Sequence, residues 1–508
     1  MLSRVVSCAV LGIEAYIVNV EVDISSGLPT FSTVGLPDAA VRESKDRVVA
    51  AIRNSGFDFP ARRITVNLAP ADTKKEGASF DLPIAVGVLL AKQDLKADVS
   101  DYCFLGELAL NGALRPVKGV LPVAASLIKH GIKNIILPLA NAPEASVVSG
   151  INVFPASSLI QVIDFLSGKT AIDAFRSSRV DLSANLDRFE LDFSDVKGQQ
   201  FAKRALEISA AGGHNVLMIG PPGSGKTMLA KRLPAILPPF TFEESLETTK
   251  ISSVAGALSQ STGLMTVRPF RSPHHTVSNI ALVGGGTFPK PGEVSLAHNG
   301  ILFLDELTEF HRDVLEVLRQ PLEDNVVTVS RAKGSITFPA SFMLIGAMNP
   351  CPCGNYGHPE KACVCTPYKI QKYRSRISGP LLDRIDIHIE VPALKTAELV
   401  NESQSGESSG AIRERVVKAR NIQKHRFSGS GVHSNSRMNT RHIKKHCALD
   451  EESKSLLRSA IDRLGFSARA YDRILKVSRT IADLEGSEKI TKNHIAEAIQ
   501  YRNLDRQL

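Results

Sequence analysis

The sequence predicts a multidomain protein with an α+β N-terminal domain, an α/β core and an all-α C-terminal domain. Short alternating apolar runs separated by helical patterns fill residues 1–170. Helix and strand patterns alternate over residues 193–394 around a glycine-rich segment, which is typical of a mostly parallel sheet with helices on both faces. Residues 411–508 show a helical pattern, and the apolar side chains within residues 456–464 fall on one face.

Two polar segments separate these domains. Residues 171–192 have weak periodicity, and we interpret them as a linker. Residues 395–410 contain the run Glu-Ser-Gln-Ser-Gly-Glu-Ser-Ser-Gly and predict a flexible connection. A chain of 508 residues is long enough for about three domains, which agrees with these boundaries.

The N-terminal domain has clear element signals. Residues 15–23 and 63–68 alternate apolar and polar side chains and predict two half-buried strands. Residues 82–91 and 120–130 show helical patterns. Strands and helices that mix in this way indicate an α+β domain.

Composition excludes several classes of protein. Hydrophobic residues make up 43% and charged residues 22%, as in a globular protein with real cores. No apolar stretch approaches the roughly 20 residues that span a bilayer, so we expect no membrane partner. Glu14 interrupts the short apolar run after Arg4, which argues against a secretory signal and predicts a cytoplasmic protein. Seven cysteines, an odd number, favour metal ligands or free thiols over a disulfide framework.

The net charge is +9, from 61 Lys and Arg against 52 Asp and Glu. A surplus of this size is compatible with a polyanionic partner such as nucleic acid. Charge alone does not decide the point, because many basic proteins bind no nucleic acid.

A glycine-rich segment follows the apolar run 216–219 and precedes a helical pattern. Glycines let successive backbone N–H groups turn toward phosphate oxygens, a lysine adds a point charge, and a threonine hydroxyl can complete a magnesium shell. The sequence therefore predicts a site for ATP and Mg²⁺. Its residues are Gly220, Pro221, Pro222, Gly223, Ser224, Gly225, Lys226 and Thr227.

Two further strands end in polar side chains that suit phosphoryl transfer. The apolar run 301–304 leads into Asp305, placed to hold magnesium, and Glu306, placed to polarise the attacking water. The apolar run 342–348 leads into Asn349, which can lie between the two catalytic strands and orient that water.

These residues resemble the catalytic set of AAA+ ATPases. The Walker B, sensor 1, arginine-finger and sensor 2 positions of that family match, in order, Asp305-Glu306, Asn349, Arg384 and Arg469. The resemblance implies that Arg384 reaches the ATP of a neighbouring subunit, so that the site is complete only in a ring. It also implies that Arg469 couples the helical lid to the γ-phosphate. Arg376 is a second, weaker candidate for the finger.

Longer blocks narrow the resemblance to the magnesium-chelatase-like branch. Together with the N-terminal domain, they resemble the bacterial YifB/ComM family across essentially the whole chain. The resemblance implies a hexameric, ATP-driven DNA helicase that promotes branch migration in homologous recombination during natural transformation, with single-stranded and branched DNA as partners. The blocks are residues 271–276, 284–286, 291–300, 318–322 and 348–354.

A basic hairpin is predicted before the Asn349 strand. Two β-rich arms within residues 326–338 flank a tip that carries Arg331 and Lys333. The hairpin resembles the pre-sensor-1 hairpin that projects into the pore of helicase-clade rings, and its cations can follow phosphates without reading sequence. An ordinary solvated hairpin is the alternative. Residues 250–298 resemble the helix-2 insert of the same clade, where His274 and His275 favour a structural role over metal binding.

Four cysteines lie in one loop after the Asn349 strand: Cys351, Cys353, Cys363 and Cys365. Four soft thiolates suit a tetrahedral structural zinc. Cys-x-Cys is tighter than the usual Cys-x-x-Cys spacing, so a redox pair and unliganded thiols remain open. Cys8, Cys103 and Cys447 have no such neighbours and are expected to be packing residues.

Residues 1–170 resemble the Lon-protease-like fold. Ser79 lies where that family carries its nucleophilic serine, and hydrolysis through a serine needs a base within hydrogen-bond reach. In that family a lysine supplies the base, and its position falls here at Leu121 or Pro122, with Lys118 off register. We therefore expect a non-catalytic domain that serves ring assembly or DNA handling.

Two alternative functions remain open at this stage. One is the ATPase subunit of a metal-chelatase complex, which would act with a large porphyrin-binding partner. The other is an ATP-dependent protease or unfoldase built on the Lon-like domain.

Overall fold

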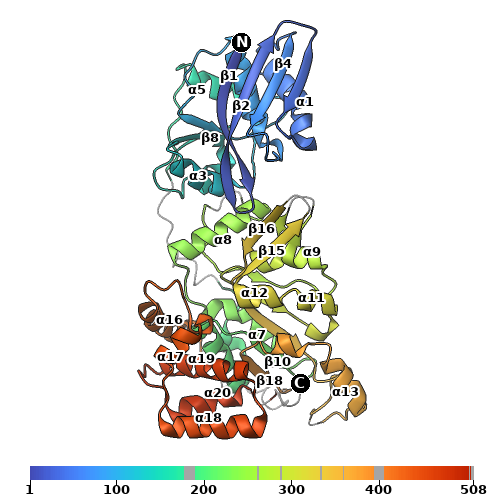
Figure 1. Cartoon of the computed structure of the whole chain (residues 1–508), viewed down its shortest axis with the longest axis vertical. Helices are drawn as coiled ribbons and strands as arrows, with labels where there is room; N and C mark the ends of the chain where they lie inside the picture. The colour runs from blue at the N-terminus through green and yellow to red at the C-terminus, as the bar shows by residue number, and fades with distance from the viewer. Residues whose placement is uncertain are drawn as a thin grey trace. The chain divides into compact units, whose positions relative to one another are not determined.

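The computed structural model describes most of the chain, drawn in Figure 1 from blue to red, in two compact units. The first unit joins Met1–Asp181 with Phe242–Met265, and the second joins Leu182–Thr241 with Thr266–Leu508. The predicted linker and connection fall largely outside the described residues. These are 1–176, 189–259, 263–286, 289–331, 334–358, 360–393, 406–502 and 504.

The first unit contains a seven-stranded mixed sheet with the order β3-β4-β2-β1-β5-β8-β9. Strands β1 and β2 form an antiparallel hairpin and β2 pairs antiparallel with β4, while the other neighbours are parallel. The alternation read in residues 15–23 puts Val18, Val20 and Val22 in the core. The strands are β1 Leu2–Leu11, β2 Glu14–Ser25, β3 Thr30–Val34, β4 Arg63–Ala69, β5 Tyr102–Phe104, β8 Asn134–Pro138 and β9 Asn152–Ala156, with a separate pair β6 Glu107–Leu108 and β7 Leu114–Arg115.

Helices of this unit pack against that sheet. Asp38 begins α1 by accepting a hydrogen bond from the Val41 N–H, and the buried carboxylate of Asp81 begins α2 and pairs with Arg47 at 2.7 Å. The helices predicted over 82–91 and 120–130 are confirmed as α2 and α3. The elements are α1 Ala39–Asn54, η1 Ala78–Phe80, α2 Asp81–Lys92, α3 Val120–Lys129, η2 Leu139–Asn141, α4 Ala142–Ala145 and α5 Leu159–Leu166.

One helix joins the first unit from far along the chain. Helix α8, Phe242–Ala255, packs on α3, although residues 193–394 were expected to form one core. A buried acceptor joins the two helices. The Glu144 carboxylate accepts hydrogen bonds from the Leu121 N–H of α3, at 2.8 Å, and from the Ser253 hydroxyl of α8. Burial raises the pKa of Glu144, so these donors offset part of the cost of enclosing it.

The second unit is built on a five-stranded sheet with the order β11-β14-β17-β10-β18, and every neighbouring pair is parallel. Every residue of β10, β14 and β17 is buried, as expected of a parallel sheet covered on both faces. Segments that follow these strands therefore meet at one edge of the sheet. The strands are β10 Val216–Ile219, β11 Phe270–Arg271, β14 Ile301–Leu304, β17 Met343–Met348 and β18 Ile387–Glu390.

Short helices and two small hairpins surround this sheet. The helical segments are η4 Phe193–Asp195, α6 Gln200–Gly212, α7 Lys226–Arg232, η5 Leu233–Ile236, α9 Asn279–Val283, α10 Glu293–Leu296, η6 Leu307–Glu309, α11 Arg312–Glu316, α12 Arg319–Asp324, α13 Pro367–Arg374 and α14 Gly379–Leu382. The hairpins pair β12 Gly284–Gly285 with β13 Lys290–Pro291, and β15 Val326–Arg331 with β16 Gly334–Pro339.

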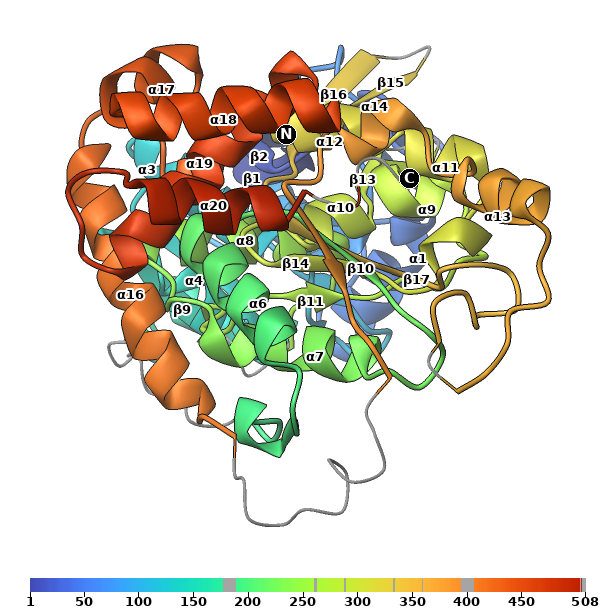
Figure 2. The ribbon, with the colours of Figure 1, turned by 90° about the horizontal axis from the view of Figure 1, so that it is seen from below.

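The C-terminal helices share a core with the sheet. Helix α19 packs against α16, α20 and α6, which Figure 2 shows beside one another, and Ile474 and Ile481 lie in the same apolar cluster as Val216. No helix in the described ranges is both long and apolar enough to cross a bilayer. The helical segments are α16 Ser409–Arg426, η7 Asn435–Arg437, α17 Thr440–His446, α18 Glu451–Leu464, α19 Ala468–Leu484 and α20 Lys492–Gln500.

Candidate nucleotide site

The glycine-rich loop turns from β10 into α7 at the carboxyl edge of the sheet. Gly223 and Gly225 have φ values of +77° and +90°, in the left-handed region that favours glycine. A Cβ on Gly220 would lie 2.1 Å from the Val391 carbonyl oxygen, whereas one on Gly223 would meet nothing within 4 Å. The start of the loop thus packs closely against the residue that follows β18, while its centre is open. This is the shape of a phosphate cradle.

Lys226 begins α7 with its side chain folded into the loop. Its ammonium donates hydrogen bonds to the carbonyl oxygens of Gly220 at 2.7 Å and Pro221 at 2.9 Å. Burial lowers the pKa of Lys226, although the charge of Asp305 acts in the opposite direction. In the described part of the chain no carboxylate lies within 4.0 Å of this cation. A buried cation held only by neutral oxygens fits an anionic phosphate ligand.

Thr227 and Asp305 bring hard oxygen ligands together from two strand ends. The Thr227 hydroxyl donates to Asp305 Oδ2 at 2.7 Å, and Asp305 Oδ1 accepts the Glu306 N–H at 3.0 Å. Hydroxyl and carboxylate oxygens next to a phosphate cradle are the donor set that Mg²⁺ prefers. These residues therefore fit a magnesium–ATP complex.

Glu306 is held in an unusual backbone conformation. Its φ of +52° is rare for a residue other than glycine, and its side chain is 58% exposed. Glu306 Oε2 lies 3.5 Å from Nδ1 of His275. From the sequence we expect a structural role for His275, and no local pattern indicates its contact with Glu306, because that contact depends on the pairing of β11 with β14.

Asn349 follows β17, which lies between β10 and β14 in the sheet order. Its Oδ1 is 3.5 Å from the Lys226 ammonium nitrogen. The structure thus places this amide between the phosphate loop and the acidic pair, as the order of the strands requires.

Arg384 lies at the opposite edge of the sheet from the phosphate loop. It precedes β18, and its carbonyl accepts a hydrogen bond at 3.0 Å from Asn215, the residue before β10. The guanidinium pairs with Glu323 and donates to the Pro380 carbonyl at 2.7 Å, with 10% of the side chain exposed. The phosphate loop follows the other end of β10, and the strand between Asn215 and the loop is about 13 Å long. Arg384 is therefore separated from the nucleotide site of its own subunit by the sheet.

Arg469 lies at the same edge as Arg384. It stands in the first turn of α19, its side chain is 59% exposed, and its Nη1 is 3.8 Å from Asp383 Oδ2. The structure brings Arg469 together with the Arg384 loop and not with Lys226. Arg376 lies elsewhere, with Nη1 on the Thr308 carbonyl at 3.0 Å and on Glu309 at 3.1 Å.

A buried ion pair joins the helical lid to the Arg384 loop. Asp386 accepts the Arg473 guanidinium at 2.7 Å and the Asn215 N–H at 3.1 Å, and its Oδ2 is 3.3 Å from His214 Nδ1. Burial by itself would raise the pKa of Asp386, but Arg473 and His214 outweigh it and hold that pKa well below its usual range. These contacts fix α19 to the residues that precede β18.

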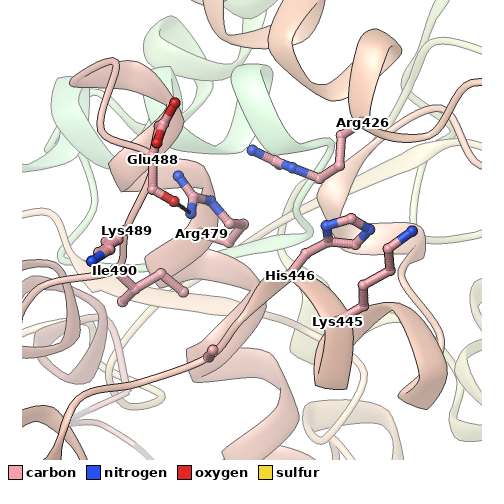
Figure 3. A pocket seen from close by; sticks show the side chains of 8 residues that line it. Arg426, Lys445, His446, Arg479, Glu488, Lys489 and Ile490 are labelled. Atoms are coloured by element: carbon pink, nitrogen blue, oxygen red, sulfur yellow. Dashed lines mark hydrogen bonds between the residues drawn. The ribbon is translucent and has the colours of Figure 1, made fainter.

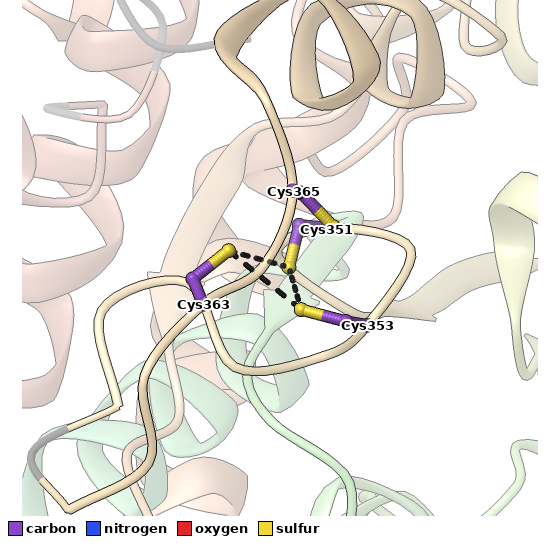
Figure 4. A group of neighbouring side chains, drawn as sticks. All are labelled: Cys351, Cys353, Cys363 and Cys365. Carbon is purple, nitrogen blue, oxygen red and sulfur yellow. Dashed lines mark hydrogen bonds between the residues drawn. The ribbon is translucent and has the colours of Figure 1, made fainter.

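The four predicted cysteine ligands converge in the loop after β17, as Figure 4 shows. Cys351 Sγ lies 3.4 Å from Cys353 Sγ and 3.7 Å from Cys363 Sγ, and all four sulfurs lie within 4.8 Å of one another. Zn–S bonds of about 2.3 Å in a tetrahedron require sulfurs roughly 3.8 Å apart. Backbone N–H groups of residues 355 and 364 lower the pKa of Cys353 to about 6. This arrangement fits a zinc ion.

The cysteine loop touches the phosphate loop. Gly354 follows the second cysteine with a φ of +78°, and a Cβ at this position would lie 2.5 Å from Cδ of Pro222. The close approach excludes any side chain at position 354 without a shift of one loop. The geometry of the cysteines therefore bears directly on the wall of the nucleotide site.

The predicted hairpin is confirmed by the backbone, with β15 and β16 paired antiparallel from Val326↔Pro339 to Arg331↔Gly334. Val327, Val329 and Phe338 are buried, which fixes one face of the hairpin. Lys333 lies outside the described residues, as does the side chain of Arg331. Their role in DNA binding stays a prediction.

Ser79 has no catalytic partner in the described structure. Its carbonyl accepts the Gly106 N–H at 3.0 Å, but its hydroxyl makes no hydrogen bond to any described residue. Leu121 and Pro122, where the lysine base would fall, are buried apolar residues of α3. The absence of peptidase activity at Ser79 stays a prediction.

Comparisons with known proteins match the whole chain. The family profiles described as "Magnesium chelatase, subunit ChlI", "Subunit ChlI of Mg-chelatase" and "Magnesium chelatase, subunit ChlI C-terminal" match residues 192–399, 20–141 and 406–502. Competence protein ComM of Haemophilus influenzae is 48% identical over 100% of this chain and 98% of its own length. Protein YifB of Escherichia coli is 46% identical over the same shares of both chains.

A more distant match concerns part of the chain. Lon protease 2 of Bacillus subtilis is 29% identical over 32% of this chain and 33% of its own length, which agrees with the Lon-like resemblance. The identity over the full length, together with the phosphate loop, the acidic strand end and the helical lid, shows that the chain belongs to the YifB/ComM family of magnesium-chelatase-like AAA+ proteins.

Proposed function

We propose that the protein is an ATP-driven DNA motor that works as a hexameric ring and promotes branch migration of recombining strands during natural transformation. The observation that carries the proposal is the separation of Arg384 and Arg469 from the phosphate loop of their own subunit. Phosphoryl transfer needs a cation on the transferring group in addition to Lys226. Since Arg384 and Arg469 lie beyond the sheet from the phosphate loop of their own subunit, we assign this role to the arginines of a neighbouring subunit.

Each residue of the cradle has a defined task in hydrolysis. With ATP bound, Lys226 would exchange the loop carbonyls for phosphate oxygens, and Thr227 and Asp305 would hold the metal ion. Mg²⁺, when bound, neutralises the charge that develops on the β and γ oxygens. Glu306 polarises the attacking water, which Asn349 helps to orient. His275 holds the Glu306 carboxylate before that step.

The sheet couples hydrolysis to movement of the subunits. Arg384 and Arg469 of one subunit meet the nucleotide of the next, and the Asp386–Arg473 pair links the finger loop to the lid. Breaking the γ-phosphate bond therefore changes the lid of one subunit and the cradle of its neighbour together. Hairpin β15–β16 directly precedes β17, so the change at Asn349 reaches the hairpin tip.

DNA is the partner that the hairpin, the net charge and the relatives support. The hairpin carries Arg331 and Lys333 at its tip, and the chain has a net charge of +9. A relative that is 48% identical over the full length bears the name competence protein, which favours DNA processing during transformation. We assign zinc to the four cysteines, which closes their loop and seats Gly354 on Pro222.

Lys226→Ala removes the ammonium from the cradle, so ATP hydrolysis and branch migration should both fall to background. Purified protein, ATP and mobile three- or four-stranded junctions are incubated, and strand products are resolved on a gel. The wild-type protein should yield products only with ATP. Strand products from Lys226→Ala at the wild-type rate would contradict the motor.

Arg384→Ala should lower ATP hydrolysis about a thousand-fold while ATP still binds, because the finger acts on the next subunit. In an equal mixture of Arg384→Ala and Lys226→Ala, about one interface in four should pair a cradle from the first variant with a finger from the second. Only these interfaces have both parts intact. Hydrolysis by the mixture should exceed that of either variant alone. Differently tagged variants confirm that mixed rings form. Mixed rings without any recovery would show that Arg384 does not act between subunits.

Arg331→Ala combined with Lys333→Ala should weaken binding of single-stranded DNA and flatten its salt dependence. Each lost phosphate contact reduces the slope of log K against log salt by about 0.7. Fluorescence anisotropy with a labelled oligonucleotide measures this slope. The control pair Lys129→Ala and Lys169→Ala removes the same charge from exposed positions of the first unit. Equal affinity of the test pair and the wild type would exclude the hairpin as a contact.

Gly354→Ala should weaken ATP binding about three- to ten-fold, because the new Cβ displaces Pro222 from the phosphate loop. Gly357→Ala is the matched control: this residue lies in the same cysteine loop at a φ of +77° with nothing within 4 Å. A fluorescent ATP analogue reports affinity, and a zinc-sensitive dye reports metal content after release. Zinc removal from the wild-type protein should reproduce the loss. Identical ATP affinities of the two glycine variants would show that the contact of the cysteine loop with the phosphate loop does not influence nucleotide binding.

A further inference from the structure

The helical lid contains a pocket that the nucleotide site does not use. It has a volume of about 210 Å³ and is formed by the ends of α16 and α17, by α19 and by the segment between α19 and α20 (Figure 3). Most of its lining side chains are basic. The lining residues are Arg426, Lys445, His446, Ala448, Arg479, Glu488, Lys489 and Ile490.

Two arginines form the fixed part of this pocket. Arg426 forms a bidentate pair with Asp483 and donates to Asn435 Oδ1 at 3.0 Å. Arg479 pairs with Asp483 at 3.0 Å and donates to the Glu488 carbonyl at 2.7 Å, and only 3% of its side chain is exposed. Both guanidinium groups are thus held in place before any ligand arrives.

Three further basic side chains line the pocket, and one of them, His446, packs its ring against the rings of Phe427 and His442. Lys445, His446 and Lys489 make no hydrogen bond or ion pair with any described residue. Figure 3 shows Lys445 and His446 on one side of the pocket and Lys489 on the other. The exposed ammonium groups of Lys445 and Lys489 are free to close on an anion between them.

The pocket has a surplus of positive charge. The four side chains of Arg426, Arg479, Lys445 and Lys489 are opposed by the carboxylates of Asp483 and Glu488. Burial lowers the pKa of His446, and the charges of Arg426 and Lys445 lower it further. An anion in this hollow would relieve the repulsion among its lining groups.

We propose that this pocket binds a phosphate group. Phosphate offers several acceptor oxygens and a single or double negative charge. The guanidinium groups of Arg426 and Arg479 are largely engaged with protein acceptors and supply mainly positive charge, whereas the two exposed ammonium groups supply the hydrogen-bond donors. The group can belong to a nucleic-acid backbone or to a free phosphate ion. The site needs no ATP and no neighbouring subunit, so it stands or falls separately from the motor function.

The test uses the full chain carrying Lys226→Ala, so that the phosphate loop is disabled in every sample. Lys445→Gln and Lys489→Gln remove two exposed charges that hold no partner. Lys418→Gln and Lys444→Gln are the matched control, since both are exposed, lie in the same lid and do not line the pocket. Circular dichroism verifies that both pairs fold as the parent does.

Two probes distinguish the sources of phosphate. Inorganic phosphate at constant ionic strength should raise the melting temperature of the parent and of the control pair by about 2–4 °C, and the test pair should lose this rise. A labelled single-stranded oligonucleotide without ATP should bind the test pair about ten-fold more weakly, with a salt slope smaller by about 0.7.

Loss of the melting shift alone identifies a free phosphate as the ligand. Loss of oligonucleotide affinity alone, or with the shift, identifies the nucleic-acid backbone. If the test pair behaves like the control pair with both probes, the pocket is not a phosphate site and the proposal is wrong.

Discussion

A five-stranded parallel sheet separates the two halves of the chemistry, and the rest of the second unit depends on this constraint. All strands run in one direction, so every segment that follows a strand emerges at one edge and every segment that precedes a strand lies at the other. The phosphate loop, the acidic pair and Asn349 belong to the first edge. Arg384 and its neighbour Arg469 belong to the second. The nucleotide site that we propose therefore combines the first edge of one subunit with the second edge of its neighbour.

The second edge is held together by buried polar groups. Asn215 donates to the Arg384 carbonyl and accepts the Leu344 N–H at 2.8 Å, which ties the starts of β10 and β17 to the finger loop. Asp386 connects the helical lid to this network through its ion pair with Arg473. Removing one partner of such a buried network is costly, so these contacts hold the Arg384 loop and the lid together.

The first edge is reinforced from outside the sheet. The cysteine loop leaves β17 directly after Asn349 and returns to lay Gly354 on Pro222. His275 approaches Glu306 from the segment after β11. Both neighbours lie far from the phosphate loop in sequence, and both touch residues of the candidate nucleotide site.

The sequence by itself determined the elements and chemical groups that depend on local order. The phosphate loop, the strands that end in Asp305 and Asn349, the β15–β16 hairpin and the four cysteines each lie within one short segment, where backbone preference and residue type suffice. Tertiary structure alone decided that Arg469 lies beside the Arg384 loop, that His275 contacts Glu306, and that α8 packs with the N-terminal unit. These contacts join segments from 30 to more than 100 residues apart. Such pairings depend on which strand edges and buried acceptors meet in the folded chain, which no local pattern encodes.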